Sequence, residues 1–194
     1  MAKILFIASS NLGKIKEFQS LLSHLNCDIR MQPNNINIEE TGKTFADNSR
    51  IKARYISKIT KSYAIADDSG LCVNCLKGRP GVFSSRYAEN DELRIKRILR
   101  EMLDSVNRSA FFVANISIAS PSGEIIGQVE AKCEGKITTY PKGDNGFGYD
   151  PIFQVKGTSL TYAEMDLETK KNYSHRNKAL KKILPILDSI FGGV

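Results

Sequence analysis

The sequence predicts an α/β protein with a mixed β-sheet, and three observations lead to this fold class. Short apolar runs rich in β-branched residues alternate with segments in which apolar residues recur at helical spacing. Two longer runs, 111–119 and 124–134, flank Pro121-Ser122-Gly123 as the strands of a hairpin would, and a hairpin adds an antiparallel pair. The 194 residues, 41% of them hydrophobic, contain no linker-like stretch or repeat, so we expect one domain over residues 1–194.

The chain opens with a predicted strand, a polar loop and a helix. The run KILFIA at 3–8 has the composition of a buried strand, and residues from about 14 to 25 place apolar side chains at helical spacing. A second strand is expected at 28–31. Thr44, followed three residues later by Asp47, resembles a capping box and predicts a helix that continues to about residue 61.

The next elements are a strand, a helix, the hairpin and a last helix. The run YAIA at 63–66 predicts a buried strand that ends in an acidic turn formed by residues 67–70. Asp91 is a plausible N-cap for a helix through Leu103. After the hairpin, residues 143–148 form a Gly-rich loop, and the last helix is expected from Ser174 to Ile190, with a kink at Pro185.

The composition favours an intracellular protein that binds an anion. The N-terminal run is too short for a signal peptide and no segment is apolar for long enough to span a membrane, so we expect a cytoplasmic protein without a membrane partner. The lone C-x-x-C at Cys72 and Cys75 has no second pair or nearby histidine to complete a zinc site. The net charge of +7 and pI near 9.2 suit nucleic acid or a small polyphosphate, and the basic residues are spread along the chain instead of forming a stripe.

The first candidate site is the polar loop Ser9-Ser10-Asn11-Leu12-Gly13-Lys14, between the first strand and the first helix. Backbone N–H groups at a helix N-terminus, the positive end of the helix dipole and a lysine together suit a phosphate. The loop is not a P-loop, because it lacks the pattern G-x-x-x-x-G-K-[ST]. Taken alone, it is more typical of an ordinary helix-capping loop.

Two acidic pairs, Glu39-Glu40 and Asp67-Asp68, form the second candidate site. Mg²⁺ prefers a few hard oxygen ligands and keeps several waters, so one or two carboxylates plus substrate phosphates suffice. A carboxylate near the metal can also take a proton from an attacking water. The first pair also fits a solvated loop, whereas the second follows a strand end, where ligand sites of α/β proteins lie.

Two further segments offer groups that could bind a base. In Gly146-Phe147-Gly148-Tyr149-Asp150-Pro151, glycines allow close backbone approach, aromatic rings offer stacking faces and the aspartate can accept from ring N–H groups. The alternative is a turn with a buried aromatic residue. Ser174-His175-Arg176, shortly after Lys170, supplies donors for a carbonyl oxygen, although a His-Arg pair is often only a surface feature.

Together, these motifs resemble one family, the inosine and xanthosine triphosphate pyrophosphatases, which include the Ham1-like proteins. The matching stretches are SSNLGK (9–14), EETGKTFADNSRIKAR (39–54), ADDSGLCV (66–73), GRPGVFSSRYA (78–88), GFGYDPIF (146–153) and SHRNKAL (174–180). Two departures are Ser9-Ser10, where the family usually has Thr-Gly, and Asp47, where a glutamate is common.

The resemblance implies a role for each matching residue. The triphosphate would be held by Ser9, Ser10, Asn11, Leu12, Gly13, Lys14 and Lys52. Glu39 and Asp68 would bind Mg²⁺, with Asp68 also the proton acceptor, and the adjacent Glu40 is the alternative to Glu39 as metal ligand. The nucleotide pocket would contain Ser69, Phe147, Gly148, Tyr149, Asp150, Lys170, His175 and Arg176.

The resemblance also implies a fold and an activity. The fold would be a long mixed β-sheet flanked by helices in two lobes, with an active-site cleft between them, and the assembly a homodimer. The enzyme would hydrolyse non-standard purine nucleoside triphosphates (ITP, dITP and XTP) to the monophosphate and pyrophosphate. Two alternatives stay open: a pyrophosphatase for another nucleotide class, and a nucleic-acid-binding module that stacks bases on Phe147 and Tyr149. The second leaves the acidic pairs without a role.

Overall fold

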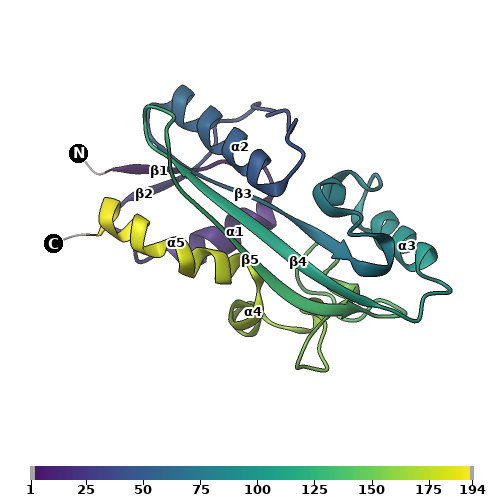
Figure 1. Cartoon of the computed structure of the whole chain (residues 1–194). Coiled ribbons are helices and arrows are strands. Elements are labelled where there is room, and N and C mark those ends of the chain that lie inside the picture. Colours follow the sequence, from purple (N-terminus) through teal and green to yellow (C-terminus); the bar gives the residue numbers. More distant parts are fainter. Residues whose placement is uncertain (1–2, 193–194) are drawn as a thin grey trace. The chain divides into compact units, whose positions relative to one another are not determined.

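The computed structural model describes residues 3–192, and its strands form one six-stranded sheet in the order β2-β1-β3-β4-β5-β6 (Figure 1). The strands are β1 (Ile4–Ile7), β2 (Asp28–Met31), β3 (Tyr63–Val73), β4 (Ser109–Ala119), β5 (Ile125–Ile137) and β6 (Phe153–Val155). Strand β1 pairs in parallel with β2 and β3, whereas β5 pairs antiparallel with β6. The predicted mixed sheet is therefore confirmed.

Five α-helices accompany the sheet in the described part of the chain. They are α1 (Leu12–Leu22), α2 (Phe45–Thr60), α3 (Asp91–Glu101), α4 (Leu167–Tyr173) and α5 (His175–Phe191). Short 3₁₀ turns lie at Asn74–Leu76, Gly81–Arg86, Asp150–Ile152 and Tyr162–Glu164. No helix within residues 3–192 is long and apolar enough to cross a lipid bilayer.

The residues divide into two compact units, which we call unit 1 and unit 2. Unit 1 contains the chain up to Asp68, Ala114–Glu130 and the residues from Ala179 onward, and unit 2 contains Ser69–Val113 and Ala131–Lys178. Strands β3, β4 and β5 contribute residues to both units.

In unit 1, α2 lies on one face of the strands, with α1 and the C-terminal part of α5 on the other (Figure 1). The contact under α2 is made mainly of small side chains, because Ala53 and Ile56 of the helix cluster with Ala64 and Ala66 of β3. Small residues allow a helix to approach a sheet closely. This packing fixes α2 beside the part of β3 that carries the acidic pair.

In unit 2, a larger apolar cluster packs α3 against the strands. Ile95 and Ile98 of α3, Phe112 of β4 and Phe153 of β6 are among its buried members. The rings of Phe112 and Phe153 meet edge to face, with centroids 4.7 Å apart. The cluster also includes Tyr149, so it reaches the segment 146–151 that is predicted to bind the base, which we call the base loop.

One predicted element is wrong: residues 67–70 are not a turn but continue strand β3, which runs from Tyr63 to Val73. Consecutive carboxylates are unfavourable in a buried strand unless each charge is compensated. Here Asp67 forms an ion pair with Lys14, and Asp68 forms one with Lys52. The apolar residues 71–73 then complete the strand.

Helix boundaries differ by a few residues from those predicted. Helix α1 begins at Leu12 instead of near residue 14 and ends at Leu22, and the N-cap of α3 is Asn90, not Asp91, since the Asn90 side chain accepts from the Leu93 N–H at 2.9 Å. The last helix is confirmed and continues through Pro185. Helix α4 and strand β6 were missed, because each is too short to show a period.

Candidate active site

The Ser9–Lys14 loop leads from β1 to α1 and is closed by its own side chains. The Asn11 side chain caps α1 by accepting from the Lys14 N–H at 3.0 Å, and the Ser9 hydroxyl accepts from the Asn11 N–H at 3.1 Å. Ser10, Asn11 and Leu12 are exposed, and Gly13 is half-buried. The N-terminus of an eleven-residue helix therefore faces solvent beside a lysine side chain.

Lys52 is the centre of a charged cluster in unit 1. This largely buried side chain projects from α2, and its ammonium lies 2.8 Å from Glu40 Oε1 and 3.1 Å from Asp68 Oδ1. It also donates to the main-chain carbonyl of Asp67 at 2.9 Å. The Lys14 ammonium approaches the other acid of the pair, with 2.9 Å to Asp67 Oδ2. Two predicted phosphate ligands are thus brought to the predicted acidic pair.

Burial and charge act in opposite directions on the ionisation of this cluster. Burial raises the pKa of the Asp68 carboxyl above its usual range, and the ammonium groups of Lys52 and Lys14 offset only part of this shift. Burial alone would lower the pKa of Lys52, but the carboxylates of Asp68 and Glu40 outweigh it and raise that pKa. Lys52 therefore keeps its positive charge, and Asp68 is a stronger base than an exposed aspartate.

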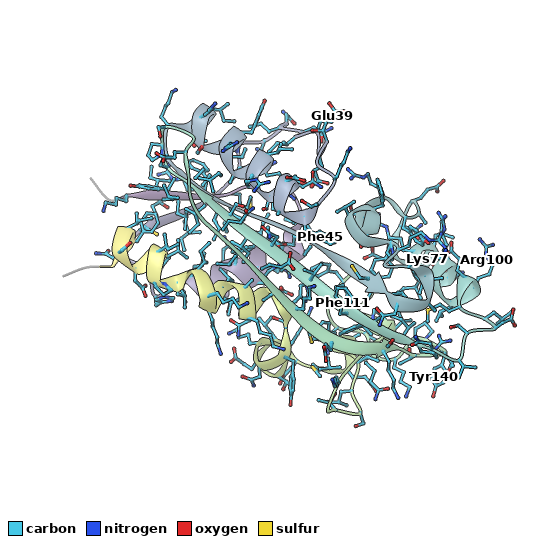
Figure 2. The ribbon with its side chains drawn as sticks, in the orientation of Figure 1. Glu39, Phe45, Lys77, Arg100, Phe111 and Tyr140 are labelled. Carbon is cyan, nitrogen blue, oxygen red and sulfur yellow. The ribbon has the colours of Figure 1, made fainter. Side chains whose placement is uncertain are left out.

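Of the adjacent residues Glu39 and Glu40, only Glu40 is seen to reach the Lys52 ammonium. Glu39 is exposed on the loop before α2 (Figure 2), whereas Glu40 is half-buried and bonded to Lys52. The two carboxylates that share the ammonium are therefore those of Glu40 and Asp68. The sequence leaves the choice of metal ligand between the two glutamates open, and the structure shows that Glu40 is the one in contact with Lys52.

The oxygen ligands in this cluster suit a hard cation with few protein ligands. Within residues 3–192, no group of three or more His, Cys, Asp or Glu side chains could enclose a metal ion. Mg²⁺ does not need one, because one or two carboxylates and substrate phosphates commonly hold it. The residues present therefore fit Mg²⁺ better than zinc, which takes four ligands in structural sites.

In unit 2, the base loop is held by a buried ion pair. Lys170 of α4 lies 2.7 Å from Asp150 Oδ2, and the same oxygen accepts from the Phe147 N–H at 2.9 Å. The Lys170 ammonium also lies 5.2 Å from the centroid of the Phe147 ring. Gly148, which has φ +64°, donates its N–H to Asp91 Oδ2 at 2.7 Å. Asp150 and Lys170 thus fix the backbone that presents the half-buried Phe147 ring.

Tyr149 of the same loop lies in the apolar core of unit 2. It is buried, and its hydroxyl donates to the Ser84 carbonyl at 2.8 Å. Burial raises the pKa of Tyr149 well above its usual range. Of the two aromatic residues in the motif, Phe147 is the one with an accessible ring.

His175 and Arg176 begin α5 and are both buried. The Ser174 hydroxyl accepts from the Asn177 N–H at 3.1 Å and so caps the helix. The His175 ring stacks on Phe112 at 4.8 Å between centroids, with 9° between the planes. Arg176 donates to the Ser69 hydroxyl at 3.0 Å, and its guanidinium carbon lies 6.0 Å from the Phe147 ring centroid. Ser69, Phe147 and Arg176 are therefore neighbours, as the motifs predict.

Sequence reasoning missed three residues that support these groups: Asn48, Asp91 and Phe112. Asn48 is buried beside Asp68, Asp91 holds Gly148, and Phe112 supports the His175 ring. A signal existed for Asn48, because it precedes Lys52 by four residues and so shares its helix face. The other two contacts join residues far apart in the chain and leave no local pattern.

Comparison with known proteins agrees with the motifs. The Ham1 family model matches residues 5–186. The chain is 53% identical over 189 residues to a dITP/XTP pyrophosphatase of Prochlorococcus marinus subsp. pastoris, which covers 97% of this chain and 99% of that protein. It is 49% identical over 185 residues to a protein of the same name from Nostoc sp., covering 95% and 94%.

Solved structures give the same result. The Staphylococcus aureus Ham1 protein matches with a TM-score of 0.86 and 35% identity, covering 97% of this chain and 100% of that one. A nucleoside-triphosphatase / dITP/XTP pyrophosphatase from Mycobacterium abscessus matches with a TM-score of 0.75 and 37% identity, covering 94% and 99%. From its motifs, its fold and these matches, the chain belongs to the Ham1 family.

Proposed function

We propose that this chain hydrolyses the non-standard purine nucleoside triphosphates ITP, dITP and XTP to the nucleoside monophosphate and pyrophosphate, and so cleanses the nucleotide pool. The observation that carries the proposal is the position of the Lys52 ammonium between the carboxylates of Glu40 and Asp68. Such a cluster offers a cation for phosphate, oxygen ligands for a metal and a proton acceptor. The similar bacterial proteins are named dITP/XTP pyrophosphatases, which supports dITP and XTP as substrates.

In this proposal the triphosphate is held by the Ser9–Lys14 loop and by Lys52. The exposed N-terminus of α1 supplies N–H groups and a positive dipole end, and the two ammonium groups add charge. When phosphate oxygens arrive, they compete with Asp67 and Glu40 for Lys14 and Lys52. Exchange of a carboxylate for a phosphate keeps each ammonium paired and limits the desolvation cost.

We assign Mg²⁺ to the carboxylates of Asp68 and Glu40, and retain Glu39 as the alternative ligand. When bound there, Mg²⁺ supplies positive charge that offsets the charge of the phosphates. Asp68 accepts a proton from the water that attacks the α-phosphorus, while the bond from that phosphorus to pyrophosphate breaks. The pKa of Asp68, raised by burial, suits a proton acceptor.

Base selection is assigned to unit 2. Phe147 offers a stacking face, and the buried donors His175 and Arg176 favour a purine with a carbonyl at C6 over adenine, which carries an amino group there. A buried donor left unpaired by the wrong base costs binding energy, so these residues can give large selectivity. Lys170 and Asp150 act on the base through the loop that they hold.

The test is Mg²⁺-dependent release of pyrophosphate from ITP, dITP, XTP, ATP, GTP and dUTP, measured side by side with wild type and Asp68→Asn. Wild type should release pyrophosphate and monophosphate from the first three, and the variant should lose nearly all turnover while it stays folded and binds nucleotide. Release of orthophosphate and a nucleoside diphosphate would mean that water attacks the γ-phosphorus. This result would refute the proposed attack at the α-phosphorus. Preference for dUTP would favour the alternative nucleotide class.

Two further expectations stay predictions. The homodimer implied by the family resemblance can be tested by sedimentation velocity at micromolar concentration. The cytoplasmic location can be tested by cell fractionation.

A further inference from the structure

The Asn48 side chain links the loop that carries Glu39, Glu40 and Gly42, which we call the acidic loop, to Asp68, the proposed proton acceptor. This side chain lies in the first turn of α2 and is 0% exposed. Its Oδ1 accepts from the Gly42 N–H at 2.8 Å, and its Nδ2 donates to Asp68 Oδ2 at 3.1 Å. The amide orientation is fixed by its partners, because a backbone N–H can only donate and a carboxylate accepts.

The loop that carries Glu40 is pressed against this asparagine. A Cβ atom added to Gly42 would lie 2.6 Å from Asn48 Oδ1 and 2.5 Å from Asp47 Cβ, closer than real Cβ contacts allow. Only glycine permits this approach. The hydrogen bond from Gly42 therefore sets the distance of the loop from α2.

The Asp68 carboxylate is held at both of its oxygens. Lys52 binds Oδ1 at 3.1 Å, and Asn48 binds Oδ2 at 3.1 Å. Asn48 and Lys52 are four residues apart on the same face of α2, so one helix restrains both oxygens. Rotation of the carboxylate would break at least one of these bonds.

Helix α2 is itself anchored at its first turn to the sheet of unit 1. Ser49 donates to Asn115 Oδ1 and lies 2.8 Å from the Ser117 hydroxyl, while Gln128 donates to the Ala46 carbonyl at 2.9 Å. These bonds are made by buried or half-buried groups. Several separate bonds hold this turn, so α2 keeps its contacts with Ser117 and Gln128 when the bond to Asn115 is removed.

We propose that Asn48 is a positioning residue that sets both the orientation of the Asp68 carboxylate and its distance from Glu40. This inference rests on the proposed function. It predicts that the two bonds of Asn48 have separable effects, one on turnover through Asp68 and the other on metal binding through the acidic loop.

Two substitutions separate the bonds. Asn48→Asp retains an acceptor for Gly42 but replaces the donor to Asp68 with a carboxylate that repels it. Asn48→Leu has a similar branched shape and loses both bonds. The control is Asn115→Leu, which removes another buried side-chain amide of unit 1. It breaks the bond between Ser49 and Asn115 but keeps the contact between Ser49 and Ser117. Each variant is compared by hydrogen exchange at the Gly42 amide, Mn²⁺ binding to the nucleotide-free protein by electron paramagnetic resonance, and kcat and KM for ITP.

In Asn48→Asp, the Gly42 amide should stay protected, while kcat falls about ten- to a hundred-fold with a smaller change in KM, because Asp68 loses a bond and faces a second carboxylate. In Asn48→Leu, the Gly42 amide should exchange faster, Mn²⁺ should bind at least about ten-fold more weakly and kcat should fall as well. Asn115→Leu should retain Mn²⁺ affinity and Gly42 protection.

The proposal is overturned if both Asn48 variants keep kcat and Mn²⁺ affinity within about two-fold of wild type, or if Asn115→Leu loses Mn²⁺ binding equally. If Asn48→Leu does not fold, Gly42→Ala replaces it, because the added Cβ displaces the acidic loop while Asn48 keeps its bond to Asp68. Unchanged Mn²⁺ affinity in Gly42→Ala then overturns the proposal. Failure of the proposed function is distinguishable: wild type would release no pyrophosphate from any nucleotide, while Gly42 protection and Mn²⁺ binding would still report on Asn48.

Discussion

Gly146→Ala should disrupt the base loop through a steric clash that the structure locates at one atom. Gly146 has φ +79°, and an added Cβ would lie 2.0 Å from Asp150 Oδ2. That oxygen accepts from the Phe147 N–H at 2.9 Å and from the Lys170 ammonium at 2.7 Å. The carboxylate must therefore move, and its two bonds cannot both survive.

The expected cost has two parts. A non-glycine residue at positive φ costs about 1–2 kcal/mol, and loss of a hydrogen bond to a charged group costs about 1.5–3 kcal/mol. The variant should therefore lose about 2.5–5 kcal/mol of the free energy of unfolding if one of the two bonds is broken. Gly157→Ala is the matched control, since Gly157 has φ +84° and no atom within 4 Å of an added Cβ. It should lose only the backbone part.

Urea unfolding of wild type and both variants measures these costs, and steady-state hydrolysis of ITP reports on the loop. Gly146→Ala should be less stable than Gly157→Ala by about 1.5–3 kcal/mol, and it alone should raise KM for ITP, because Phe147 is released with Asp150. Equal stability of the two variants, within about 0.5 kcal/mol, would refute the steric argument. If Gly146→Ala is less stable than Gly157→Ala but has an unchanged KM for ITP, the base loop does not take part in base binding.

Three other substitutions test separate parts of the site. Arg176→Ala should lower kcat/KM for ITP far more than for ATP, by one to two orders of magnitude in their ratio, because only a keto base gains from that donor; an equal fall for both would assign Arg176 to structure or phosphate. Lys52→Met should reduce kcat/KM for ITP by about one to two orders of magnitude, and unchanged kinetics would exclude Lys52 from triphosphate binding. Tyr149→Phe should lower the free energy of unfolding by about 1–3 kcal/mol, because the buried Ser84 carbonyl loses its donor, and urea unfolding that matches wild type would contradict this.

Local sequence patterns were sufficient for most of the fold. Strand β2 at Asp28–Met31 and the hairpin of β4 and β5 are confirmed, because their apolar periods and turn residues are local signals. The extension of β3 through Asp67 and Asp68 was missed, since two acids in sequence indicate a turn. Their burial depends on Lys14 and Lys52, which compensate the charges from other elements.

The motifs group the candidate site residues, whereas the contacts that support these residues leave no pattern in the sequence. Motif residues such as Lys52 and Arg176 lie beside their expected neighbours. The choice between Glu39 and Glu40 could not be made from sequence, because adjacent residues differ only in side-chain direction. The sequence predicts Asp91 only as a helix cap, because its bond to Gly148 depends on a tertiary contact across 57 positions of the chain.

The alanine-lined contact under α2 limits how the protein can diverge. Ala53 is 0% exposed and packs with Ala64 and Ala66, so even a valine there would push the helix outward by more than the packing can absorb. Because Lys52 precedes Ala53, that displacement would move the ammonium away from the carboxylates it joins. Substitutions at this apolar contact would therefore change the catalytic rate without altering any group that touches the nucleotide. Directed evolution for rate should vary these alanines as well as the site residues.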